Sequence, residues 1–192
     1  MEIEGAPRAW NRGDEDRLIS GFRLPSTEGR LLGPWEFKHR RNLVLLFLRE
    51  ADSSQRLLQA LARRYLNLQA LHAAVLVIVG GDEEGARDLH RRFRLELPFP
   101  FLLDPEDRVA PLCLGAEASR PALLLLDRYN ALWARLEPEP QGEGEPEAEV
   151  QEIEDWLEFI ELQCPECDVP DRSPSGRLTS LRGGSKAKGE ES

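Results

Sequence analysis

The sequence predicts an α/β protein built around a sheet whose central strands are parallel and buried. Two runs, Asn42–Leu48 (NLVLLFL) and Ala74–Val79, are apolar throughout, without the alternation of a strand that has one face in water. Strands of this kind are buried on both faces, as in the middle of a parallel sheet. Each run is followed by a segment whose apolar residues recur at helical spacing. This strand–helix–strand order is typical of an α/β fold.

The first helix is expected directly after the first of these strands. Asp52 is placed to act as its N-cap, and Gln55 three residues later gives a variant of the capping box. Leucine and tyrosine side chains then recur at helical spacing as far as Leu68. A second helix is expected from Asp82 to about Arg94, after the second buried strand.

Short segments precede and follow these two units. Two short strands are expected around residues 22–24 and 30–32, because turn-forming residues separate them. The segment Leu97–Asp104 returns the chain to the sheet. A short helix is expected over Pro105–Leu112, since proline suits the first turn of a helix. A hairpin formed by residues 122–126 and 131–136 completes the sheet.

An acidic segment and an amphipathic helix follow the hairpin. Glu137–Ala148 (EPEPQGEGEPEA) consists almost entirely of Glu, Pro and Gly, which predicts an extended linker. The next segment, Val150–Gln163, has one apolar stripe that must pack either on its own domain or on a partner: Val150, Ile153, Trp156, Leu157 and Ile160.

The predicted organisation therefore has five parts along the chain. A polar lead occupies residues 1–17, and the α/β domain occupies residues 18–136. The acidic linker spans residues 137–148, and the amphipathic segment that ends in Cys-x-x-Cys spans residues 149–170. The tail, residues 171–192, has no periodicity and is expected to be disordered.

The net charge of −10 comes from one region. Residues 137–161 contain ten Glu, one Asp and no Lys or Arg, so the rest of the chain carries +1. A near-neutral domain offers no electrostatic basis for holding a phosphate backbone, so nucleic-acid binding is not expected. Neither a membrane-spanning apolar run nor a secretion signal in residues 1–11 is present, and we expect a cytoplasmic protein.

Four segments between Leu18 and Leu136 occur in a familiar order: Gly21–Leu24 with Glu28–Arg30, Leu43–Arg49, Leu97–Asp104, and Arg120–Arg128. This order resembles the alkyl hydroperoxide reductase/thiol-specific antioxidant and redoxin families. The resemblance implies a thioredoxin-like sheet flanked by helices, with the C-terminal helix as an addition. It also implies antioxidant or disulfide-exchange chemistry.

In those families the turn after the central strand holds a reactive cysteine, and the N-terminus of the following helix lowers the pKa of its thiol. Here that turn is Arg49–Arg56 (READSSQR), and the resemblance places Ser53 and Arg56 at the two cysteine positions. A serine hydroxyl cannot form sulfenic acid or a disulfide, so the usual site is absent. Pro121 resembles the proline beside that site, and Arg120 the arginine that orients peroxide. The alternatives are a strand-entry proline and a surface arginine.

The chain has three cysteines. Cys113 lies between apolar residues and is expected to be buried and inert. Cys164 and Cys167 form a Cys-x-x-Cys pair with three open interpretations: a redox dithiol, half of a zinc site completed by another chain, or neither. The preceding acidic helix is expected to raise the pKa of both thiols, which counts against redox chemistry.

Two functions follow from these observations. The first is a thiol-redox protein that works through Cys164 and Cys167 instead of the usual turn. The second is a catalytically inactive member that keeps the fold for binding or regulation. The expected partners are a thiol–disulfide electron donor or another protein, and the Trp156 stripe would suit a homodimer. No cofactor is expected, and no metal apart from the zinc alternative.

Overall fold

The computed structural model describes residues 18–19, 21–49, 55–81, 84–85, 87–88, 91, 97–115, 121–137 and 145–162. All of them belong to the first of the two units into which the chain divides, Met1–Leu162. The second unit, Gln163–Ser192, lies outside the described residues.

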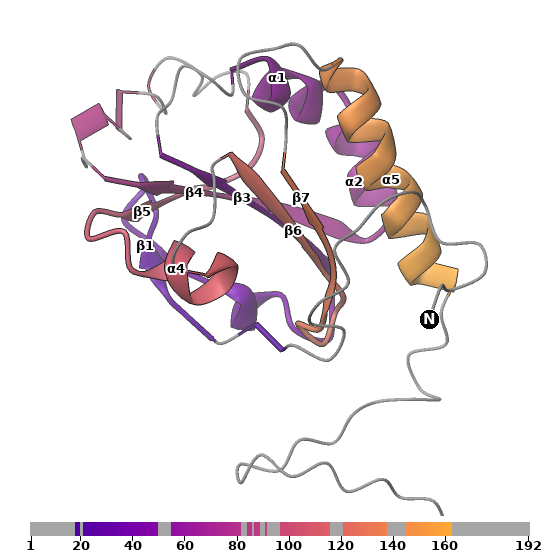
Figure 1. The fold of residues 1–192 in the computed structure, drawn as a ribbon, viewed down its shortest axis with the longest axis horizontal. Coiled ribbons are helices and arrows are strands. Elements are labelled where there is room, and N and C mark those ends of the chain that lie inside the picture. The colour runs from indigo at the N-terminus through magenta and orange to yellow at the C-terminus, as the bar shows by residue number, and fades with distance from the viewer. Residues whose placement is uncertain are drawn as a thin grey trace, which may run out of the picture. The chain divides into compact units, whose positions relative to one another are not determined.

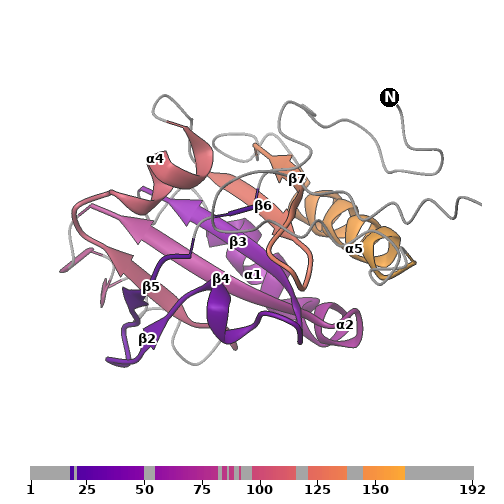
Figure 2. The ribbon, with the colours of Figure 1, turned by 90° about the horizontal axis from the view of Figure 1, so that it is seen from below.

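The centre of the first unit is a five-stranded sheet with the order β5-β4-β3-β6-β7 (Figures 1 and 2). Its strands are β3 (Asn42–Leu48), β4 (Ala73–Gly80), β5 (Phe101–Asp104), β6 (Ala122–Leu126) and β7 (Leu132–Leu136). Strands β3, β4 and β5 are parallel, whereas β6 and β7 run antiparallel to their neighbours. The carboxyl ends of β3, β4 and β5 therefore meet at one edge of the sheet, which we call the carboxyl edge.

The buried strands confirm the expectation from their apolar runs. Every residue of β3 and of β4 is buried. Alternate side chains enter two different apolar clusters, with Leu45 and Phe47 on one face and Leu46 and Leu48 on the other. Because both faces are covered, neither strand shows the polar alternation of a half-exposed strand.

Helices cover both faces of the sheet. One face carries α1 (Gln55–Arg63), α2 (Tyr65–Ala70) and α5 (Pro146–Leu162). The other carries α4 (Val109–Leu114) and the region of the antiparallel pair β1 (Leu24–Pro25) and β2 (Leu31–Leu32). Figure 1 shows α4 on the opposite side of the sheet from α1, α2 and α5.

The first of the two helices expected after the buried strands differs from the structure, and the second is described only in part. The segment predicted as one helix up to Leu68 forms two, α1 and α2, which are separated at Arg64. The proposed N-cap Asp52 lies outside the described residues. Of the helix predicted from Asp82, residues 84, 85, 87, 88 and 91 are helical and the others are not described.

The prediction that a helix begins at Pro105 is wrong, and the reason is the side chain of Asp104. Its carboxylate accepts hydrogen bonds from the backbone N–H groups of Arg108 (3.0 Å) and Val109 (2.8 Å). The backbone N–H of Asp107 donates to the carbonyl of Asp104 at 2.8 Å. Pro105 therefore lies in a turn, and α4 begins at Val109, where the Asp104 carboxylate satisfies the exposed N–H groups of its first turn.

Helix α5 packs on its own domain. It begins at Pro146, four residues before the expected Val150, since a proline and two glutamates favour the first turn of a helix. All five residues of its apolar stripe are buried, and all except Ile160 belong to the apolar cluster that also contains Leu46 and Leu48 of β3. Trp156 is thus part of the core rather than a partner surface, and the stripe no longer supports a homodimer.

A row of glutamates fixes α5 against its neighbours at intervals of seven residues. Glu147 pairs with Arg63, and Glu154 pairs with Arg64. In the last turn of α5, the Glu161 carboxylate accepts a hydrogen bond from Asn42 Nδ2 at 2.7 Å. Residues seven apart lie on one side of a helix, so the three carboxylates form a line. We call these three residues the glutamate row. The hydrogen bond that Arg64 donates to Glu154, together with the negative charge of Glu154, raises the pKa of Arg64.

Two leucines on α5 provide a test of its docking. Leu157 is completely buried, whereas Leu162 is 83% exposed. We expect Leu157→Ala to lower the free energy of unfolding by about 2–5 kcal/mol, because it leaves a cavity in the core. Leu162→Ala should change it by less than about 0.5 kcal/mol. Urea denaturation followed by far-UV circular dichroism measures both values.

The same measurement separates packing on the domain from packing on a partner. If α5 packed on a second chain, the urea midpoint of the unaltered protein would rise with protein concentration. A Leu157→Ala variant as stable as Leu162→Ala would contradict the observed docking, as would a midpoint that rises with protein concentration even in high salt, which screens contacts between charged surfaces.

Candidate functional site

The turn that resembles a thiol site leaves the sheet at the carboxyl edge. Phe47 lies opposite Ala122 in the β3–β6 pairing, so the next residue along β3, Leu48, is level with Pro121. Pro121 is buried and precedes β6 directly. The structure therefore places Pro121 beside the point where the chain leaves β3.

The other positions of that site are only partly described. Arg56 is exposed in the first turn of α1, pointing away from the apolar stripe of that helix. Ser53 and Arg120 lie outside the described residues. Of the four positions that the resemblance singled out, Arg56 and Pro121 are the two that the structure locates, one at the start of α1 and one at the carboxyl edge.

Charged residues that the sequence interpretation did not single out border this edge. The guanidinium of Arg49, directly after β3, lies 3.8 Å from the carboxylate of Asp107 in the turn after β5. This ion pair spans the end of β4, which separates β3 from β5. Asp107 has a positive φ of 51°, a conformation that Asp adopts more readily than most residues. The Asp-Pro-Glu-Asp run was the available signal, since such runs mark turns and helix caps.

Cys113 does not contribute a thiol to this edge. It lies in α4 with 3% of its surface exposed, in the apolar cluster that also contains Val109, Ala110 and Leu114. The expectation that it is buried is confirmed. It is also the single cysteine among the described residues, so the described part of the carboxyl edge offers guanidinium and carboxylate groups but no nucleophilic sulfur.

The amphipathic helix ends at the other edge of the sheet. Glu161, in the last turn of α5, accepts a hydrogen bond from Asn42 at the start of β3 and lies 3.1 Å from Nδ1 of His72, next to the start of β4. The seven residues of β3 separate this edge from the carboxyl edge by about 20 Å. Cys164 and Cys167 lie outside the described residues.

The described residues do not form a metal centre. Within the parts of the chain that the structure describes, no three or more His, Cys, Asp and Glu side chains are grouped to hold a metal ion. The zinc alternative for Cys164 and Cys167 needs ligands from another chain and stays a prediction. In the same parts of the chain, no helix combines the length and the apolarity that crossing a membrane requires.

Comparison with known proteins identifies the fold. No family model matches the chain. No curated protein matches it either. Among solved structures, peroxidoxin BcpB from Mycobacterium tuberculosis aligns with a TM-score of 0.63 at 14% identity, covering 76% of this chain and 97% of that one. AhpC from Enterococcus faecalis aligns with a TM-score of 0.63 at 12% identity, covering 76% and 93%.

A third similar structure belongs to a different class of thiol protein. A putative thiol:disulfide interchange protein, DsbE, from Chlorobium tepidum aligns with a TM-score of 0.62 at 16% identity, covering 75% of this chain and 98% of that one. Identities this low establish the architecture and not the chemistry. The chain has a thioredoxin-like fold of the kind found in peroxiredoxins, as the order of its sequence segments predicted.

The burial of Cys113 leads to a prediction about thiol reactivity. In a Cys164→Ser/Cys167→Ser variant, we expect Cys113 to react with a small thiol reagent at least about 100-fold more slowly in the folded protein than in urea, because the side chain must first be exposed by an opening of the structure. Labelling followed by mass spectrometry measures both rates. Equal rates in the two conditions would show that Cys113 is accessible in the native protein.

Proposed function

We propose that this protein carries out thiol-redox chemistry through Cys164 and Cys167, and that it does so apart from the turn after β3. One observation supports this above all: of its three cysteines, the one inside the described fold is buried in the core. The turn Arg49–Arg56 contains no cysteine. The Cys-x-x-Cys pair is therefore the remaining source of a reactive thiolate.

The proposed chemistry is disulfide exchange with a partner protein. A thiolate of the pair attacks a disulfide of the partner, forming a mixed disulfide and releasing one partner thiolate. The second cysteine of the pair then attacks the mixed disulfide and releases the other partner thiolate. The pair ends as a disulfide, having given two electrons to the partner, and a thiol–disulfide electron donor restores it. The similar structures described as peroxidoxin and thiol:disulfide interchange proteins support this class of reaction.

The anchoring of α5 bears on how such a pair could work. The glutamate row holds the helix on the domain, and its last turn lies at the amino ends of β3 and β4. For Cys164 to act at the turn after β3, the chain beyond Leu162 would have to cross about 20 Å, the length of β3. Two residues of extended chain span about 7 Å, and the five residues from Leu162 to Cys167 span at most about 18 Å. The proposal therefore does not involve the turn or the residues Arg56 and Pro121.

A second function is favoured by a different observation. Pro121 keeps its buried place beside β3, and Arg49, directly after β3, pairs with Asp107 at the same edge, although the turn contains no cysteine. A fold that keeps this edge without the thiol suits a binding or regulatory module with no turnover. In that case, Cys164 and Cys167 would be inert or would bind metal with another chain.

The reduction potential of the pair distinguishes the two functions. We expect thiol trapping of the metal-free protein across a dithiothreitol series to show one two-electron transition between roughly −200 and −270 mV, the range of glutaredoxin- and thioredoxin-type proteins. The transition should be absent from Cys164→Ser and unchanged in Cys113→Ala. The Cys113→Ala variant removes the buried thiol without touching the pair.

A pair that forms no disulfide at any accessible potential would contradict the redox proposal. The binding module would then be the better description, and zinc that co-purifies in proportion to the pair would identify a metal-binding role. A transition that disappears in Cys113→Ala would also contradict the proposal, because it would assign the disulfide to the wrong cysteine.

A further inference from the structure

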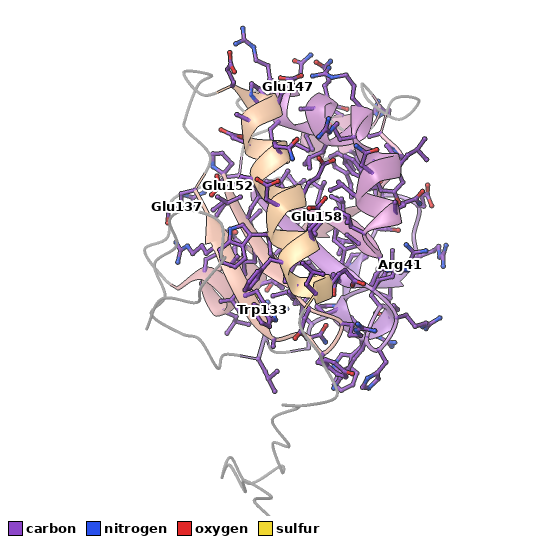
Figure 3. The ribbon with its side chains drawn as sticks, turned by 90° about the vertical axis from the view of Figure 1, so that its right-hand side faces the viewer. Arg41, Trp133, Glu137, Glu147, Glu152 and Glu158 are labelled. Atoms are coloured by element: carbon purple, nitrogen blue, oxygen red, sulfur yellow. The ribbon has the colours of Figure 1, made fainter. Side chains whose placement is uncertain are left out.

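We draw no further inference here: the strongest candidate, the surface patch of basic side chains just before β3 (Arg41 in Figure 3), carries nothing, because the negative charges of Asp127 and Glu161 lie beside it and nothing in the described part of the chain shows what would cover it.

Discussion

Glu154 is a buried carboxylate, and its pairing with Arg64 is the interaction on which the position of α5 depends. A carboxylate inside a protein is strongly disfavoured unless a cation and hydrogen bonds compensate for the lost water. Only 6% of the Glu154 side chain is exposed, and two nitrogens of Arg64 approach its two oxygens. The packing of the apolar stripe and this ion pair both define how α5 lies on its neighbours. Glu154 permits one position, the one at which Arg64 faces it, and Glu147 and Glu161 then meet their own partners.

The position of α5 decides much of the remaining architecture. Strands β3 and β4 are buried on both faces, so the sheet requires a second layer on the face opposite α4. Helices α1 and α2 cover part of that face, and α5 covers the part next to β6, where Trp156 and Phe159 contact each other with ring centres 5.8 Å apart. Phe159 also meets Trp133 of β7. Docking α5 thus completes the core and ends the described chain at the edge away from the turn after β3.

The sequence predicted those parts of the fold that depend on one residue and its neighbours in the chain. The bounds of β3 were predicted because its residues form one uninterrupted apolar run, and a strand of this kind is buried on both faces of the sheet. The start of α4 was not, because the Asp104 carboxylate and Pro105 compete for the same turn and the backbone geometry decides between them. The partner of α5 was open, since an apolar stripe is equally suited to its own domain and to another chain. The spacing of the glutamate row was visible, but its partners come from segments about 85 to 120 residues away.

The location of the candidate sites has a consequence for the proposed redox chemistry. Pro121 is fixed by the β3–β6 pairing, and Arg49 lies 3.8 Å from Asp107 across the end of β4, so the described part of the carboxyl edge is formed without a thiol. A dithiol that follows α5 lacks the positive helix terminus that activates thiols at that edge. In the sequence this pair comes after the last turn of α5 and after a run of glutamates, and we expect both to favour the protonated thiol. We therefore expect the proposed exchange through Cys164 and Cys167 to be fastest with a partner whose disulfide is surrounded by a cationic surface, because positive charge favours the thiolate.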